Sequence, residues 1–389
     1  MSAGFWRAAV VVGVALALWA AFEWGVPRQG SLVELPPLPA LRPNQRLAQA
    51  QHLFPNDWIG PESFAFDEQD RMYAGLADGR IVRWDGASER YELFARTGED
   101  LPECGTYEAR RATPTHQYTL EGRSAADTRW CAEPRCGRPL GMKFDAHKRL
   151  IVADAYQGLL SFSPAGDERR VLVAGSELTF PNDMAVLPGE EGTLLFTDST
   201  HKHRRRDVML EVLDMGGNGR LLAYHPANGS LEVVLADLHF PNGVCLHADG
   251  DSLLINELTL FRVIRYYFRG SKRGQVEVFA DNLPGTPDNI RRMHSTGHYL
   301  IGVGAKRTQP FALLNSLSPY PRLRDLVAFL LPRRWASWLD ENGKVLEGYH
   351  DPAGRTAWIS EAEEWKGHLY MGSFTNPFLA RIKIDDEQH

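Results

Sequence analysis

Five oxygen-bearing side chains stand at equivalent places along this chain, directly after a proline or one residue further on. They are Glu62, Asn182, Asn242, Asp288 and Asn289. Carboxylate and amide oxygens are the ligands that hard divalent cations prefer, and no thiol or imidazole occupies these places. If the fold brings the five side chains together, the sequence predicts a site for Ca²⁺ or another hard divalent cation.

A simpler interpretation is that these residues only form turns. Asn and Asp favour the turn after a proline because their side chains hydrogen-bond the nearby backbone. Glu62, however, is a poor turn former and holds the same place. Two carboxyl groups brought together would also repel each other and raise a pKa unless a cation is present. We therefore favour the cation site, with turn formation as the alternative.

The five side chains belong to a unit that recurs along the chain. The copies have a turn with proline, a short strand, a second turn and a strongly apolar strand; the sixth copy is weaker, and several copies add a third and a fourth strand. The copies begin near residues 60, 138, 181, 241, 287 and 357. This recurrence predicts an all-β fold, a six-bladed β-propeller, whose radial closure avoids open sheet edges. A β-sandwich with a second domain, the alternative, does not explain the recurrence.

The propeller explains how distant residues could meet. The residue that begins the innermost strand of each blade faces the central channel, so equivalent residues of successive blades lie on one ring. We therefore expect the five oxygen-bearing side chains to converge on the axis. The second copy has Leu140 at this place and offers no ligand.

Composition excludes several other classes of protein. The 389 residues are 43% hydrophobic and 24% charged, which is typical of globular proteins. With 43 Lys and Arg against 49 Asp and Glu, no excess of positive charge favours a nucleic-acid partner. The glycine-rich stretch 215–219 lacks the strand-turn-helix context of a nucleotide or flavin site.

The N-terminus predicts export. Residues 5–26 contain an uncharged apolar run and suit a signal anchor that crosses a membrane once, with a cleaved signal peptide and a buried helix as alternatives. Residues 27–50 are rich in proline and predict a semi-rigid linker, so the propeller is expected at 51–389. We expect a single-pass membrane protein with its propeller on the periplasmic, extracytoplasmic or lumenal side.

The cysteines suggest one disulfide bond. Cys131 and Cys136 lie in a loop flanked by Gly and Pro where a bridge is sterically reasonable, and export would let it persist. Free thiols or a pairing with Cys104 are the alternatives.

One apolar segment interrupts the repeat. Residues 318–339 predict a helix flanked by arginines and carrying Trp335 and Trp338. A lid over the channel, an interfacial helix touching the membrane and a helix packed on the propeller rim all fit this pattern.

Several segments resemble a known family. The matching stretches include CGRPLG (136–141), FPNDMAV (180–186), FPNGV (240–244) and LPGTPDNIR (283–291). They are similar to the strictosidine synthase-like group within the superfamily of gluconolactonase and paraoxonase propellers. The resemblance implies that Glu62, Asn182, Asn242 and Asp288 ligate a calcium-type ion, and its paraoxonase branch alone implies the same for Asn289.

The resemblance also implies an activity, the hydrolysis of small lactones or aryl esters, in which the ion polarises the carbonyl group and a base activates water. The histidine pair of the paraoxonase-like branch is absent, since the corresponding stretch has Leu140 and Asp154. The gluconolactonase resemblance allows Asp288 to act as both ligand and catalytic base. Glu347 falls near the place of the catalytic glutamate of strictosidine synthases, although strictosidine synthase activity itself is not expected. A non-catalytic propeller with a structural metal, binding a ligand or protein partner, is the alternative function.

Overall fold

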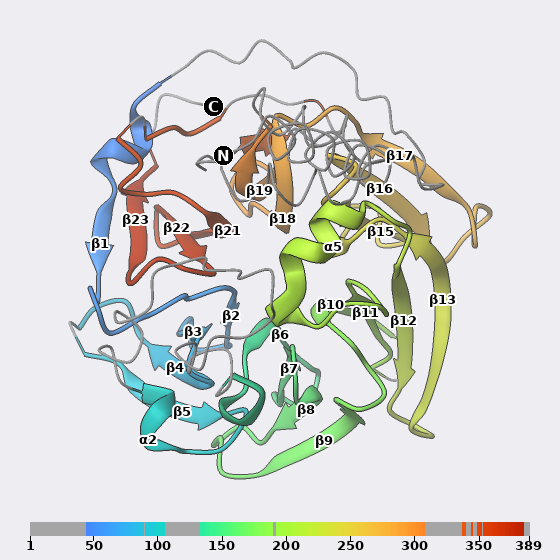
Figure 1. Cartoon of the computed structure of the whole chain (residues 1–389), viewed down its shortest axis with the longest axis horizontal. Helices are drawn as coiled ribbons and strands as arrows, with labels where there is room; N and C mark the ends of the chain where they lie inside the picture. The colour runs from blue at the N-terminus through green and yellow to red at the C-terminus, as the bar shows by residue number, and fades with distance from the viewer. Residues whose placement is uncertain are drawn as a thin grey trace, which may run out of the picture.

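The computed structural model describes residues 44–88, 90–105, 133–189, 192–307, 337–339, 344, 348–351 and 353–384. In these residues, antiparallel sheets are arranged around a common centre, which confirms the predicted all-β propeller (Figure 1). Five sheets are complete four-stranded blades, against the six blades expected. A further sheet has three strands in the described part of the chain.

We number the sheets 1 to 6 by the chain order of their inner strands. Sheet 1 contains β2 (Phe64–Phe66), β3 (Met72–Gly75), β4 (Arg80–Trp84) and β5 (Glu92–Arg96). Sheet 2 contains β6 (Pro139–Phe144), β7 (Leu150–Asp154), β8 (Gly158–Phe162) and β9 (Arg169–Ala174). Sheet 3 contains β10 (Pro181–Val186), β11 (Leu194–Asp198), β12 (Gly219–His225) and β13 (Ser230–Leu238).

The remaining sheets follow the same order. Sheet 4 contains β14 (Pro241–Leu246), β15 (Ser252–Glu257), β16 (Arg262–Tyr267) and β17 (Val276–Ala280). Sheet 5, the three-stranded one, contains β18 (Gly285–Arg292), β19 (Tyr299–Lys306) and β20 (Ser337–Leu339). Sheet 6 contains β21 (Ile359–Trp365), β22 (His368–Ser373), β23 (Leu379–Lys383) and β1 (Gln51–Leu53).

The apolar core lies between neighbouring sheets. Successive side chains of a strand point to opposite faces, and both faces of these sheets are covered, so the second strand of a blade can be buried throughout. In β7 every residue is buried. Its Ile151 packs with Met184 and Phe196 of sheet 3, whereas its Val152 packs with Tyr73 of sheet 1. This packing holds the inner strands in place around the axis.

The first and last parts of the folded body are joined in sheet 6. Strand β1 pairs with β23, where Gln51 lies opposite Arg381. The preceding 3₁₀ helix η1 (Arg46–Gln49) buries Leu47 to 1% exposure in the core of this region. Asn44 donates a hydrogen bond to the Gly348 carbonyl at 2.5 Å. The folded body therefore begins inside the expected linker 27–50, because Leu47 supplies core packing.

A short helical excursion lies toward the centre of the molecule (Figure 1). Between β11 and β12 the chain forms η2 (Arg205–Asp207) and α5 (Val208–Asp214). Val208 and Val212 pack against Leu140, Phe180 and Phe240, which belong to sheets 2 to 4 or to the turns before their inner strands. The excursion therefore packs against the starts of the inner strands of these three sheets.

The favoured pairing of Cys131 with Cys136 was wrong, and the alternative of a pairing with Cys104 is confirmed. Cys136 is bonded to Cys104, which lies in α2 (Pro102–Gly105), and their Cα atoms are 5.5 Å apart. The two segments meet because the Glu99 amide donates to the Arg135 carbonyl at 2.8 Å. Cys131 lies outside the described residues.

Other expectations fall partly outside the described residues. The anchor 5–26, Glu347 and most of 318–339 lie there. The last three residues of 318–339 form β20, so the expected helix is wrong at this end, where pairing with β19 extends sheet 5. Among the described residues, no helix combines the length and apolar character needed to span a membrane.

Candidate metal centre

The structure buries all five oxygen-bearing side chains that the sequence singled out. The exposed fractions are 4% for Glu62, Asn182 and Asn242, 6% for Asp288 and 1% for Asn289. Glu62 lies just before β2, and the others lie near the starts of β10, β14 and β18. We call these five residues the oxygen ring. Their deep burial is not what turn residues on a surface would show.

An irregularity in three inner strands presents the ring residues Asn182, Asn242, Asp288 and Asn289. The register of each inner strand with its neighbour shifts between Pro181 and Met184, between Pro241 and Val244, and between Pro287 and Ile290. Such bulges take residues out of the regular ladder and re-aim their side chains. The same shift in sheet 2, between Pro139 and Met142, presents Leu140 instead of a ligand.

Glycines allow neighbouring inner strands to approach closely beside the ring. A Cβ atom on Gly243 would lie 2.5 Å from the Cα atom of Asn289. On Gly141 it would lie 2.5 Å from the Cα atom of Asp183. Real Cβ atoms do not tolerate such distances. Glycine at these two positions therefore permits the narrow spacing of the ring.

Direct contacts connect ring residues that are far apart in sequence. The Asn289 amide nitrogen donates to the Glu62 carbonyl at 3.3 Å and reaches Glu62 Oε1 at 3.4 Å. The Asn182 amide nitrogen donates to Ser199 Oγ at 3.1 Å. These contacts orient the two amides, and their Oδ1 atoms have no hydrogen-bond partner among the described residues.

Four ring oxygens are buried and have no hydrogen-bond partner among the described residues. They are Glu62 Oε2, Asn182 Oδ1, Asn242 Oδ1 and Asn289 Oδ1. A buried acceptor without a partner costs about 1–3 kcal/mol, so four in one region are unexpected unless something binds them. Oxygen acceptors beside two carboxyl groups match the ligand set of a hard divalent cation. The donor set therefore fits such an ion.

The carboxyl groups of the ring also indicate a missing positive charge. Burial raises the pKa of Glu62 to about 7, although Arg138 partly offsets the effect. Burial, together with repulsion from Glu62, raises the pKa of Asp288 well above its usual value, and hydrogen bonding with Asn242 partly offsets this. A cation between the two groups would favour their charged forms.

Sequence reasoning missed one member of this region. Asn256 of β15 is fully buried and donates to the Asp288 carbonyl at 2.6 Å. Its Oδ1 atom also has no hydrogen-bond partner among the described residues. The available sign was an amide within the otherwise apolar stretch LLIN of the second strand.

Charged groups lie beside the start of β6 in sheet 2. Arg138 is fully buried and donates to the Gly60 carbonyl at 2.8 Å. Burial and the nearby Arg205 lower the pKa of Arg138 to about 10. Arg205 pairs with Glu133 at 2.5 Å, and Tyr156 donates to the same carboxyl group at 2.5 Å. These groups place positive charge near Glu62.

A second group of possible metal ligands is already satisfied by protein donors. His203, Glu211 and Asp214 bring ligand atoms within 4.8 Å of one another. Glu211, however, accepts hydrogen bonds from Thr200 at 2.7 Å and from Asn218 at 3.1 Å. The Lys202 ammonium group lies 2.6 Å from Asp214. These contacts explain the cluster without an ion.

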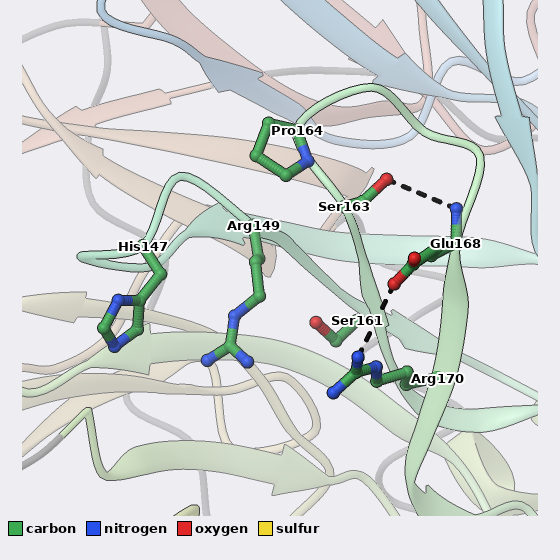
Figure 2. Close-up of a pocket in the computed structure, with 7 residues that line it drawn as sticks. All are labelled: His147, Arg149, Ser161, Ser163, Pro164, Glu168 and Arg170. Carbon is green, nitrogen blue, oxygen red and sulfur yellow. Dashed lines mark hydrogen bonds and ion pairs between the residues drawn. The ribbon is translucent and has the colours of Figure 1, made fainter.

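A surface pocket of about 410 Å³ lies in sheet 2, away from the oxygen ring. Its lining residues are His147, Arg149, Ser161, Ser163, Pro164, Glu168 and Arg170 (Figure 2). Arg149 is paired with Asp145 at 2.6 Å, and Arg170 lies 3.5 Å from Glu168. Because its charges are paired and no ring residue lines it, we assign no function to this pocket.

Comparisons with solved structures agree with the architecture. A gluconolactonase from Xanthomonas campestris is similar in fold, with 16% identity and a TM-score of 0.54 over 92% of this chain and 97% of that chain. A calcium-binding protein, regucalcin, from Agrobacterium tumefaciens has 14% identity and a TM-score of 0.52 over 86% of this chain and 91% of that chain. The fold is therefore that of the gluconolactonase-type β-propellers.

Sequence comparisons define the family more closely. The strictosidine synthase profile matches residues 182–271, and the N-terminal strictosidine synthase-like profile matches residues 40–84. The adipocyte plasma membrane-associated protein of Gallus gallus is 35% identical over 92% of this chain and 84% of its own length. Strictosidine synthase-like protein 10 of Arabidopsis thaliana is 36% identical over 82% of this chain and 84% of its own length. The chain belongs to the strictosidine synthase-like family, together with the adipocyte plasma membrane-associated proteins.

Proposed function

We propose that this protein hydrolyses small lactones or aryl esters with the help of Ca²⁺ or another hard divalent cation. Glu62, Asn182, Asn242 and Asp288 would hold the ion, with Asn289 beside them. The observation that supports this proposal is the set of four buried ring oxygens without hydrogen-bond partners. The gluconolactonase and the calcium-binding regucalcin with the same fold add support.

In the proposed reaction the ion and the side chains would have different roles. A bound divalent cation supplies positive charge that polarises an ester carbonyl and stabilises the oxyanion. Of the two ring carboxyl groups, we assign Asp288 as the base for the attacking water. Glu347, outside the described residues, remains the second candidate. Arg138 and Arg205 add positive charge near Glu62. The apolar neighbours Leu140, Phe180 and Phe240 would reduce the water near the site, which strengthens electrostatic interactions.

Hydrolysis tests this proposal directly. We expect the full-length protein in detergent to hydrolyse members of a lactone and aryl-ester panel, to lose this activity in EDTA and to regain it with Ca²⁺. Asp288→Asn keeps the size and an oxygen ligand but removes a charge and the base, so turnover should fall roughly 100-fold or more. Glu347→Gln is the companion variant, and if it alone abolishes turnover, the base is Glu347.

The rival function is a non-catalytic propeller that uses the ion as a structural pin. The apolar Leu140 on the sheet that carries the histidine pair in paraoxonase-like relatives favours this alternative. Under it, Asp288→Asn lowers metal affinity and the melting temperature, but no member of the panel is turned over. Wild-type protein that neither hydrolyses the panel nor contains metal contradicts both functions.

We also propose that residues 5–26 anchor the protein in a membrane as a single span, with the propeller on the extracytoplasmic side. The name of the adipocyte plasma membrane-associated relatives supports a membrane association. The segment 318–339 is a second candidate for membrane contact, and its last three residues belong to sheet 5.

A further inference from the structure

A second tier of charged side chains lies next to the oxygen ring and centres on Arg291. This residue is the third after Asp288 in β18 and is only 4% exposed. Its Nη1 atom donates to Asp183 Oδ2 at 2.7 Å, and its Nη2 atom lies 2.7 Å from Glu361 Oε2. Nη2 also donates to Ser63 Oγ at 3.2 Å. One guanidinium group therefore connects sheet 5 with sheets 1, 3 and 6.

The partners of Arg291 are close neighbours of the ring in the sequence. Ser63 directly follows Glu62, and Asp183 directly follows Asn182. Asp183 Oδ2 also accepts a hydrogen bond from the Val244 amide at 2.9 Å, which extends the network to sheet 4.

Sheet 6 takes part without supplying a ring residue. Glu361 directly follows Ser360, whose hydroxyl group donates to the Glu62 carbonyl at 3.0 Å. The tier thus touches the backbone segments that carry ring residues in sheets 1, 3, 4 and 5, and it also touches sheet 6.

We propose that Arg291 is a positioning residue that sets the spacing of the oxygen ring by holding these segments together. This inference rests on the cation site of the proposed function. The planar guanidinium group presents several donors in fixed directions, which suits one residue that must contact two carboxyl groups and a hydroxyl group. Lysine would keep the charge but could not reproduce these directions.

If Arg291 positions the ring, replacing it should weaken binding of the ion and not only destabilise the fold. Residues that orient metal ligands typically change metal affinity 10- to 100-fold when they are replaced. Mg²⁺ demands a small, near-octahedral site, whereas Ca²⁺ accepts a wider range of geometries. A ring with looser spacing should therefore lose Ca²⁺ affinity and change its preference between Ca²⁺ and Mg²⁺.

The experiment compares Arg291→Lys with wild type and with Arg149→Lys, all as full-length protein. Arg149 is a matched control because it pairs at 2.6 Å with Asp145, whose side chain is 6% exposed, within the turn at the far end of β6. Titrations with Ca²⁺ and Mg²⁺ below the melting temperature measure affinity, and melting of the metal-free proteins measures stability. We expect Arg291→Lys to bind Ca²⁺ at least tenfold more weakly than wild type and to show an altered ratio of Ca²⁺ affinity to Mg²⁺ affinity. Arg149→Lys should bind both ions as wild type does.

Each other result has a definite meaning. If Arg291→Lys melts at a lower temperature but binds both ions as wild type does, Arg291 is only structural and the proposal is wrong. If wild type binds no divalent cation, the cation site itself fails. If Arg291→Lys does not fold, Glu361→Gln decides, since it keeps an oxygen and removes one charge; unchanged Ca²⁺ affinity in that variant overturns the proposal.

Discussion

The raised pKa values of Glu62 and Asp288 indicate that a positive charge is missing beside this pair of carboxyl groups. Both are buried, and repulsion from Glu62 contributes to the raised pKa of Asp288. Asn289 touches Glu62, and Asn256 fixes the Asp288 carbonyl. Neither contact supplies positive charge to the carboxyl groups. We therefore expect the carboxyl groups of the metal-free ring to bind and release protons as the pH changes.

The pKa of Glu62, raised to about 7 by burial, gives a prediction on pH. A carboxyl group whose pKa is higher in the folded than in the unfolded state stabilises the fold at low pH, and this contribution is lost as pH rises through the folded pKa. In EDTA, the contribution of Glu62 should therefore make the protein melt at a lower temperature at pH 8 than at pH 6. Ca²⁺ favours the deprotonated ring, so the increase in melting temperature on adding Ca²⁺ should be larger at pH 8.

Melting curves at the two pH values, each with EDTA and with Ca²⁺, check this expectation. Glu62→Gln is the control, because it removes the titrating group and should reduce the dependence on pH in EDTA. An equal effect of Ca²⁺ at pH 6 and pH 8 would count against titration of the ring.

At the residue scale, the sequence revealed the ring but not what holds it. The place after a proline identified Glu62 and Asn242, because the turn with proline recurs with the same local spacing. Arg291 and Asn256 could not be found in this way, since their roles depend on which strands meet across the channel. The spacing of residues along the chain does not show which strands lie next to each other in the fold.

At the scale of the elements, the inner strands and their bulges bring the ring residues together into one site. The bulge re-aims the residues after Pro181, Pro241 and Pro287, and glycines such as Gly243 let adjacent inner strands approach. The predicted recurrence of strands identified these elements. The disulfide and the segment 318–339 were harder to predict, because the partner of Cys136 and the end of β20 are set by contacts between distant segments.

Gly243→Ala tests the close approach of the inner strands. The added Cβ atom would lie 2.5 Å from the Asn289 Cα atom, so β14 and β18 must move apart. Overpacking of this kind costs about 1–3 kcal/mol of stability. Because the movement displaces Asn242 relative to Asn289, Ca²⁺ affinity should fall as well.

Gly250→Ala is the matched control in the same sheet. Gly250 has a φ of +73° and no neighbouring atom within 4 Å of an added Cβ atom, so the substitution introduces backbone strain without a clash. It should lower the melting temperature but leave Ca²⁺ affinity unchanged, as measured by calorimetric titration. Equal affinity in both variants would show that the spacing of β14 and β18 does not control the ring.

At the scale of the whole molecule, the expected location gives the next prediction. If residues 5–26 form the anchor, the full-length protein should sediment with membranes, and its propeller should be cleaved by protease added from the extracytoplasmic side. A variant that lacks residues 1–26 should no longer sediment. Continued sedimentation of that variant would assign membrane binding to another part, such as 318–339, and recovery of the full chain in the cytoplasm would contradict the topology.

The pairing of β1 with β23 has a consequence for the order of folding. Gln51 and Arg381 are 330 residues apart, so β1 is synthesised long before the strand with which it pairs. Contacts between such distant residues form slowly, and until then the edge of β23 that β1 covers stays open to other chains. A chain that ends before residue 379 would lack β23, so β1 would have no partner and the ring would stay open, which should favour aggregation.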